Sequence, residues 1–93
     1  MRIMWTHSAR RDLMTHVDHL AARNPNAALQ LEAAALQMIE GLIDFPHRGR
    51  PGRRKETCEL LIPGLPYVVV YSISEDHILV LRLLHTEQDW PPR

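Results

Sequence analysis

The sequence predicts an α+β domain in which a helical hairpin packs on an antiparallel sheet, with the element order β-α-α-β-β-β. Apolar residues recur with a helical period between residues 9 and 20 and again between residues 26 and 44. The short Asn24-Pro25 link between these segments favours two antiparallel helices. Two apolar runs rich in β-formers, 65–71 and 78–85, flank a short polar turn, which is the pattern of a β-hairpin. Because helices and strands are segregated along the chain, they are expected to form two layers.

The first strand and the first helix are predicted at the N-terminus. Residues 2–5 are short and partly apolar, as in a strand. Thr6 or Ser8 suits the N-cap of the helix because a hydroxyl there accepts a backbone N–H. The helix is amphipathic with one buried stripe, made of Ala9, Leu13, Val17 and Leu20.

The second helix is expected from Asn26 to Asp44. Asn24 caps it, and Pro25 suits its first position, where a missing N–H costs nothing. Its apolar face is wide, which predicts contact with both the first helix and the sheet. That face comprises Ala28, Leu31, Ala35, Met38, Ile39 and Leu42, broadened by Leu29, Ala33, Leu36 and Ile43. Phe45-Pro46 ends the helix, since proline disfavours helical geometry at the preceding residue.

Three strands are predicted after the helices. Residues 47–56 are rich in glycine, proline and charge, which predicts a surface loop. Thr57–Ile62 follows as a strand and Pro63-Gly64 as a turn, so that this strand and the hairpin form a meander. The last strand stops at His85, and the polar cluster 85–90 is expected at the edge of the sheet.

Size and composition restrict the class of protein. The 93 residues suit one domain, residues 1–93, and the apolar content of 45% is that of a globular chain. Cys58 is the single cysteine and has no partner for an internal disulfide, and residues 1–7 are too polar for a secretory signal. No apolar run approaches the roughly 18 residues that span a bilayer. A cytoplasmic protein without membrane insertion is therefore expected.

The charges are unevenly distributed although the formal net charge is zero. Five of the 11 basic residues fall in one segment without an acid, which we call the basic loop: Arg48, Arg50, Arg53, Arg54 and Lys55. The rest of the chain holds six basic and 11 acidic residues, a net charge of −5. The basic loop is therefore a candidate surface for an anionic partner, although charged loops that only keep a protein soluble are also common.

Several short features occur along nearly the whole sequence in a definite order. They are Ala9 with Asp12-Leu13, Asn24-Pro25 with Ala27-Ala28, Leu42, Pro46, Gly49-Arg50, Pro66 through Tyr71, and Leu84-His85 with Asp89. In this order and at this length, the chain resembles the ParE/RelE superfamily of bacterial toxins from type II toxin–antitoxin pairs. The resemblance implies a RelE/ParE-like fold and a partner antitoxin, encoded by an adjacent gene, with which the toxin forms a hetero-oligomer.

Two branches of the superfamily differ in activity. RelE-type members are ribosome-dependent mRNA endoribonucleases with basic residues on the strand matching 57–62 and an arginine before the next Val-Val-Tyr. This chain has Glu59 and Val68 there, where cations would otherwise stabilise the charged transition state. ParE-type members lack that basic set and end their last long strand with a similar Leu-His followed by Asp. The resemblance is thus closest to the ParE branch, which implies a non-enzymatic inhibitor of DNA gyrase.

Two alternatives remain open at the level of sequence. In an RNA-cleaving protein, His85 is the candidate acid and Glu56 or Glu59 the candidate base. An inactive family member that only binds antitoxin is the other alternative. The residues expected to contact a target or antitoxin are the basic loop together with His85, Gln88, Asp89 and Trp90.

Further candidate sites come from apolar surface and from metal-ligand residue types. Met4, Leu13 and Val17 are the candidate floor of a groove for an antitoxin helix or strand. Asp12, His16 and His19 have helical spacings at which side chains share a face, but no further ligand converges on them, so no metal is expected. Cys58 is interpreted as a packed strand residue, not a nucleophile, and no cofactor is predicted.

Overall fold

The computed structural model describes residues 1–91 and contains two helices and five strands. In chain order these are β1 (Arg2–Trp5), α1 (His7–Ala21), α2 (Pro25–Gly41), β2 (Arg50–Pro51), β3 (Cys58–Leu61), β4 (Tyr67–Ile73) and β5 (His77–His85). Neither helix of the described chain has the length and apolar character needed to cross a bilayer.

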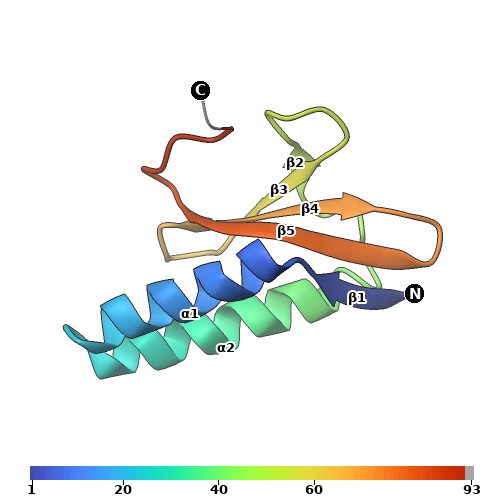
Figure 1. Ribbon diagram of the computed structural model, residues 1–93. Helices are drawn as coiled ribbons and strands as arrows, with labels where there is room; N and C mark the ends of the chain where they lie inside the picture. The colour runs from blue at the N-terminus through green and yellow to red at the C-terminus, as the bar shows by residue number, and fades with distance from the viewer. Residues whose placement is uncertain (92–93) are drawn as a thin grey trace.

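The strands form one sheet in the order β1-β5-β4-β3-β2, with both helices on one side of it and the C-terminal segment on the other (Figure 1). This arrangement confirms the predicted α+β fold. The sheet is mixed, however, and not wholly antiparallel, because β1 runs parallel to β5 with Arg2 opposite His77 and Trp5 opposite Val80. A helical hairpin between β1 and the later strands returns the chain to the same end of the sheet, which permits this parallel pair.

The helix N-termini form as predicted. The hydroxyl of Thr6 accepts the N–H of Ala9 at 3.0 Å, and the side chain of Asn24 accepts the N–H of Ala27 at 3.1 Å. Each bond satisfies a backbone donor that has no partner inside the helix. The predicted end of α2 at Asp44 is wrong, because the N–H of Leu42 bonds to the carbonyl of Ile39 at 3.0 Å and the chain leaves the helix in a tight turn.

The apolar face of α2 is narrower than its sequence indicates. Ala28, Leu31, Ala35, Ile39 and Leu42 are buried as expected. The residues expected to broaden that face include Leu29 and Leu36, which are 66% and 46% exposed. A helix packed against one partner helix and one sheet leaves a sector uncovered, and these two leucines lie in it.

The segment predicted as loop 47–56 contains a short strand, β2. Arg50 pairs with Glu59 and Pro51 with Cys58, which makes β2 the outermost strand of the sheet. Proline is tolerated there because an edge strand has one side without ladder hydrogen bonds. The neighbouring strand β3 is one residue shorter at each end than the predicted 57–62.

Tyr71 fixes the start of the basic loop to the middle of the sheet. Its hydroxyl donates to the carbonyl of Pro46 at 2.7 Å and accepts the N–H of Gly49 at 2.9 Å, and the residue is fully buried. A Cβ at Gly49 would lie 2.7 Å from that hydroxyl oxygen, so only glycine fits this close approach. The backbone that leads into the basic loop is therefore held in one place.

Candidate interaction site

The sheet face opposite the helices carries most of the predicted site residues. Side chains alternate along β4, so that Tyr67, Val69 and Tyr71 face the helices while Val68 and Val70 face the other way. The register places Glu59 opposite Val70 and Leu61 opposite Val68, and on the other side Arg82 and Leu84. We call this surface the open face; it consists of Glu59, Leu61, Val68, Val70, Arg82 and Leu84.

Glu59 is a buried carboxylate that binds the basic loop. Its Oε2 atom accepts the backbone N–H of Arg53 at 2.9 Å and the Nε–H of the same residue at 3.3 Å. Nη2 of Arg50 lies 3.5 Å from Oε1. The side chain of Glu59 is 1% exposed, whereas those of Arg50 and Arg53 are 75% and 50% exposed. The two arginines therefore cover a carboxylate that would otherwise be buried without a countercharge.

These contacts also determine the pKa of Glu59. Burial alone raises the pKa of a carboxyl group, since it disfavours the charged form. Here the hydrogen bonds from Arg53 and the charges of Arg53 and Arg50 outweigh burial and hold the pKa of Glu59 below its ordinary value. The group stays ionised at neutral pH and is a poor proton acceptor, which does not suit the candidate role of general base.

The basic loop and the C-terminal segment meet on the open face. Trp90 packs with Val68, Val70 and Leu84. The guanidinium of Arg54 lies 6.0 Å from the centroid of the Trp90 ring and that of Arg82 lies 5.6 Å from it. Both distances are in the range of cation–π contacts. Two segments that are 36 residues apart in sequence, at Arg54 and Trp90, thus share one surface.

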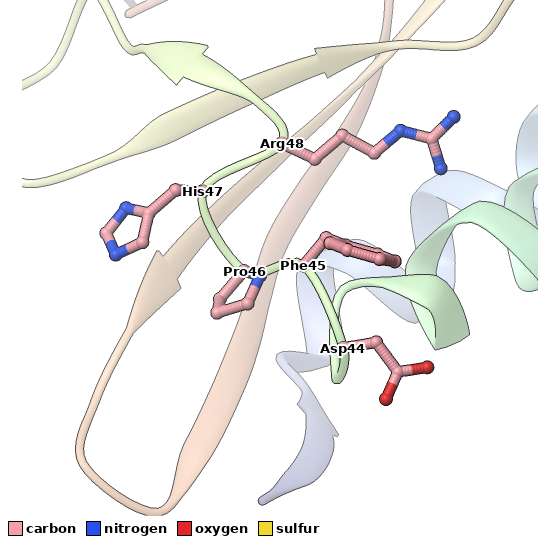
Figure 2. A pocket seen from close by; sticks show the side chains of 5 residues that line it. All are labelled: Asp44, Phe45, Pro46, His47 and Arg48. Atoms are coloured by element: carbon pink, nitrogen blue, oxygen red, sulfur yellow. The ribbon is translucent and has the colours of Figure 1, made fainter.

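The remaining cations of the basic loop have no carboxylate partner within residues 1–91; they are Arg48, Arg54 and Lys55. Arg48 belongs to a hollow of about 730 Å³ that follows α2, lined by residues 44–48. Figure 2 shows Arg48 and Phe45 on the side of the chain that faces the helices and His47 on the other side. The Arg48 guanidinium lies beside Gly41 at the end of α2, where a positive charge complements the helix dipole.

His85 and Glu59 do not come together. His85 pairs with Tyr67 in the sheet and packs edge-on against its ring at 5.3 Å, on the helix side. The ring Nδ1 of His85 accepts the backbone N–H of Glu87 at 3.1 Å. The backbone N–H of His85 donates to the side-chain oxygen of Gln88 at 2.7 Å. Glu59 lies on the opposite face, so these two residues have no acid–base geometry.

Glu56 and Cys58 line a different hollow, of about 940 Å³, at the β2–β3 edge together with His47. Glu56 has a φ of 64°, the left-handed region that non-glycine residues seldom adopt. Cys58 is free and partly exposed. Asp89 is exposed and makes no ion pair with another described residue.

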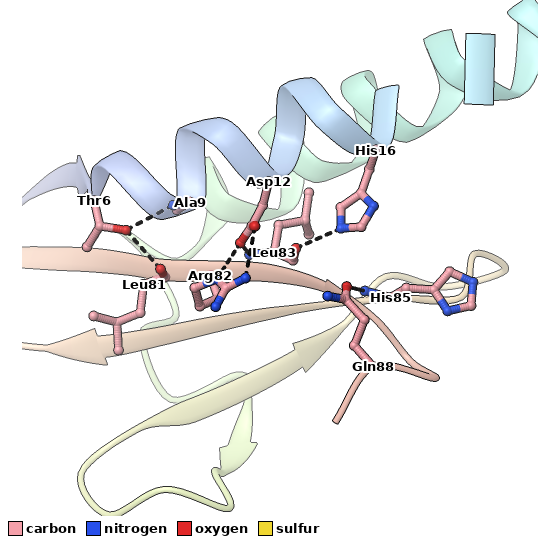
Figure 3. A network of polar contacts seen from close by, with 9 residues as sticks. All are labelled: Thr6, Ala9, Asp12, His16, Leu81, Arg82, Leu83, His85 and Gln88. Carbon is pink, nitrogen blue, oxygen red and sulfur yellow. Dashed lines mark hydrogen bonds and ion pairs between the residues drawn. The ribbon is translucent and has the colours of Figure 1, made fainter. Parts of the chain in front are cut away.

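Side chains of α1 cover the edge of β5 beyond the point where β1 ends (Figure 3). The hydroxyl of Thr6 donates to the carbonyl of Leu81 at 2.8 Å. One oxygen of Asp12 accepts the N–H of Leu83 at 3.0 Å and the Nε–H of Arg82 at 2.7 Å, and Arg82 also bonds to the other oxygen at 3.1 Å. The bonds to the backbone of Leu81 and Leu83 replace the hydrogen bonds that a neighbouring strand would make. The hydrogen bonds between Arg82 and Asp12 raise the pKa of Arg82.

His16 lies one turn further along α1 and also contacts β5. We call the contacts of Thr6, Asp12 and His16 with β5 the seam. The Nε2 atom of His16 lies 3.0 Å from the carbonyl of Leu83, which makes that nitrogen the donor, and the ring packs edge-on against Tyr67 at 5.1 Å. Burial lowers the pKa of His16 despite the opposing effects of the Leu83 carbonyl and Asp12. The proximity of Asp12 and His16 has a structural role, and no group of three metal-ligating side chains occurs in the described part of the chain.

The candidate groove residues separate in the structure. Leu13 lines a shallow apolar hollow of about 320 Å³ between α1 and α2, together with Trp5, Arg10, Met14 and Leu36. We call this the helix hollow. Val17 packs against the core, and Met4 is 41% exposed on β1. Only Leu13 of the three predicted residues therefore belongs to the helix hollow.

Comparison with known proteins identifies the family. The family model described as the ParE toxin of type II toxin–antitoxin system, parDE, matches residues 3–90. The chain belongs to the ParE toxin family. It is a type II toxin–antitoxin toxin, as the resemblance of its residues predicts.

Relatives of this ParE-family chain match over almost its whole length. Protein Y4kP of Sinorhizobium fredii (strain NBRC 101917 / NGR234), named as a candidate toxin, is 37% identical over 97% of this chain and 93% of its own. Toxin RelE2 of Caulobacter vibrioides (strain ATCC 19089 / CIP 103742 / CB 15) is 26% identical over 90% of this chain and 93% of its own. A structure titled as the chromosomal ParDE TA system from P. aeruginosa superposes with a TM-score of 0.81 at 23% identity, covering 91% of this chain and 95% of that one.

Three residues of this ParE-family toxin contribute to its surfaces but were not among the predicted site residues, although the sequence contains a pattern that indicates each of them. Arg82 is the one charged residue in the apolar run 78–84, and a lone cation there indicates a specific partner, which is Asp12. Met14 and Leu36 fall outside the buried stripes of their helices, and an apolar residue on that sector indicates surface available for contact.

Proposed function

We propose that this ParE-family toxin inhibits DNA gyrase by protein contact, without RNA cleavage, and that a cognate antitoxin neutralises it in a hetero-oligomer. The open face carries the main support. At the two positions named above where RNA-cleaving relatives have cations, this chain has Glu59, a buried carboxylate of lowered pKa, and Val68, which packs against Trp90. Such a face has neither a proton acceptor suited to neutral pH nor free cations on its strands to stabilise a phosphate transition state.

The proposal of an antitoxin partner has separate support. The P. aeruginosa structure is titled as a ParDE system, and its fold covers 91% of this chain. The helix hollow exposes Met14 by 66% and Leu36 by 46%, and neighbouring exposed apolar side chains of this kind mark a surface for contact with another protein.

RNA cleavage is the second candidate, and the relative from Caulobacter vibrioides named RelE2 is the observation that favours it. The two activities are separated by one pair of assays on purified toxin free of antitoxin. Gyrase supercoiling and DNA cleavage are measured in one assay and mRNA cleavage on translating ribosomes in the other. We expect loss of supercoiling with intact mRNA. Cleaved mRNA with unaffected gyrase would show that the RelE-type function is the correct one.

The contribution of the basic loop is tested by reversing its three cations that have no described carboxylate partner. Arg48→Glu, Arg54→Glu and Lys55→Glu together leave in place the contacts of Arg50 and Arg53 with Glu59, including the bond to the loop backbone. We expect gyrase inhibition to weaken by about tenfold or more, because charge complementarity governs association. The matched control reverses Arg2, Arg11 and Arg23, with the same change in net charge, and should inhibit normally. Equal inhibition by both triple variants would exclude the basic loop from the contact.

A further inference from the structure

Two buried polar atoms on the open face have no hydrogen-bond partner within residues 1–91: Oε1 of Glu59 and Nε1 of Trp90. One is an acceptor and the other a donor. Oε1 makes only the ion pair with Nη2 of Arg50 at 3.5 Å, which is too long for a good hydrogen bond. Glu59 lies opposite Val70 in the sheet, and Trp90 packs against the cluster that contains Val70. Buried polar atoms in native proteins are almost always paired, directly or through one ordered water. A donor and an acceptor without hydrogen-bond partners thus lie on the same face.

The other oxygen of Glu59 already holds the basic loop. It binds Arg53 through both the backbone N–H and the side chain, at 2.9 and 3.3 Å. A backbone bond of this kind fixes the path of the loop itself and not only the position of one side chain. Arg54, the next residue, then stacks on the ring of Trp90.

We propose that Glu59 is a positioning residue that joins the basic loop and the C-terminal segment into one binding surface. One carboxylate oxygen binds Arg53. The other, which also lies 3.5 Å from Nη2 of Arg50, accepts the indole N–H of Trp90 through one ordered water. The proposal rests on the proposed role of the basic loop as a contact surface, but its structural part holds whatever the target is. Under this proposal, Glu59 has a positioning role in place of the candidate role of general base.

The first test measures the order of the basic loop by limited trypsin digestion. Glu59→Gln keeps the size of the side chain and removes its charge, and Glu56→Gln is the matched control with the same charge change on a residue that makes no described ion pair. Cleavage after Arg53 or Arg54 should be about tenfold faster in Glu59→Gln, since the loop opens more often when its charged acceptor is lost. Glu56→Gln should match the natural chain. Equal cleavage of both variants overturns the proposal.

The second test observes the indole N–H of Trp90 by NMR. The chain has two tryptophans, so a Trp5→Phe background leaves one indole signal. In that background the Trp90 N–H should be protected from solvent exchange, with Glu56→Gln unchanged and Glu59→Gln exchanging about tenfold faster. Unchanged exchange in Glu59→Gln would show that the carboxylate does not serve the indole, and the proposal would fail.

A third variant covers the case in which Glu59→Gln unfolds the whole domain. Trp90→Phe removes the indole N–H and keeps an aromatic ring outside the helix-side core. Tryptic cleavage of the basic loop should still rise several-fold; no rise overturns the link between the two segments. Gyrase assays on the same proteins distinguish the two proposals. A natural chain that leaves gyrase unaffected while Glu59→Gln loosens the loop would refute the proposed target and retain the positioning role.

Discussion

At the scale of single residues, the structure depends on side chains that satisfy two polar groups at once. Tyr71 is the principal case, because one hydroxyl serves both the carbonyl of Pro46 and the N–H of Gly49. Asp12 does the same for a backbone N–H and a guanidinium. Removing such a group leaves several buried partners unpaired, which costs more than the bond itself contributed.

The hydroxyl of Tyr71 is expected to contribute measurably to stability. Tyr71→Phe should lower the free energy of unfolding by about 1–3 kcal/mol, because the N–H of Gly49 loses its acceptor inside the protein. Tyr67→Phe is the matched control, since Tyr67 is also buried but its hydroxyl makes no described hydrogen bond. Urea unfolding measures both. A loss as large in Tyr67→Phe would contradict the role assigned to the Tyr71 bonds.

Residue identities predicted caps and turns well but did not predict burial of charge. Thr6, Asn24 and Gly64 act locally, so their neighbours in sequence were sufficient to identify them. Glu59 sits between apolar neighbours at a position that alternation assigns to the open face, which by itself indicates an exposed residue. Its burial accompanies the return of Arg53 and Arg50 over the strand, and neither contact has a local sequence signal.

At the scale of elements, the seam between α1 and β5 explains why a helix can lie against the edge of a strand. The register shifts between Val70 and Tyr71 of β4, so that Val70 faces Arg82 and Tyr71 faces Val80, with Leu81 as the extra residue of β5. A bulge of this kind locally disrupts the ladder between the two strands. On the other edge of β5, where β1 ends at Trp5, the N-cap Thr6 binds the carbonyl of Leu81. Asp12 and His16 of α1 bind the N–H and the carbonyl of Leu83.

The seam makes stability depend on pH through His16. Its folded pKa lies below the ordinary value of 6.5, so the unfolded chain binds a proton more readily. The free energy of unfolding should therefore fall as pH drops through 6.5 and be restored above it. His16→Gln should flatten this slope between pH 7.5 and 5.5, whereas His19→Gln, on the exposed side of α1, should retain it. Parallel slopes for the two variants in thermal or urea unfolding would exclude His16 as the source.

The sequence predicted that Asp12 and His16 lie on the same face of a helix, but it did not predict which residues they contact. Their partners lie 70 and 67 residues away, at Arg82 and Leu83. Helical spacing is a local property, while the placement of β5 beside α1 depends on a parallel strand pair and a bulge that no short segment specifies. For the same reason β2 was missed: its two residues become a strand only because β3 lies next to them.

At the scale of the whole molecule, two surfaces lie on opposite sides of the sheet. Arg53, Arg54 and Trp90 lie on the open face, and the helix hollow lies on the side of the helices. A chain arranged in this way presents two chemically different surfaces. Under the proposed function, a target and an antitoxin have separate places to bind.

Antitoxin binding is expected to depend on the helix hollow. Met14→Glu introduces a charge into it and should weaken antitoxin affinity by about tenfold or more, because apolar anchors dominate such contacts. Leu29→Glu is the matched control, since Leu29 has the same 66% exposure as Met14 but does not line the hollow. Both variants should unfold like the natural chain, and calorimetric titration with the neighbouring gene product measures the affinities. Equal weakening by the two would place the contact elsewhere.

The parallel pairing of β1 with β5 has a consequence for how the chain folds during synthesis. Arg2 lies beside His77 of β5, so the strand that is translated first has no partner until the last element has been made. Contacts this distant in sequence are slow to form, because a long segment must be ordered before they contribute. The N-cap Thr6 also reaches to Leu81, and Asp12 of α1 reaches to Leu83. A ribosome-bound chain that stops before β5 therefore lacks both the sheet neighbour and the seam, and a toxin built this way completes its fold only after synthesis of β5.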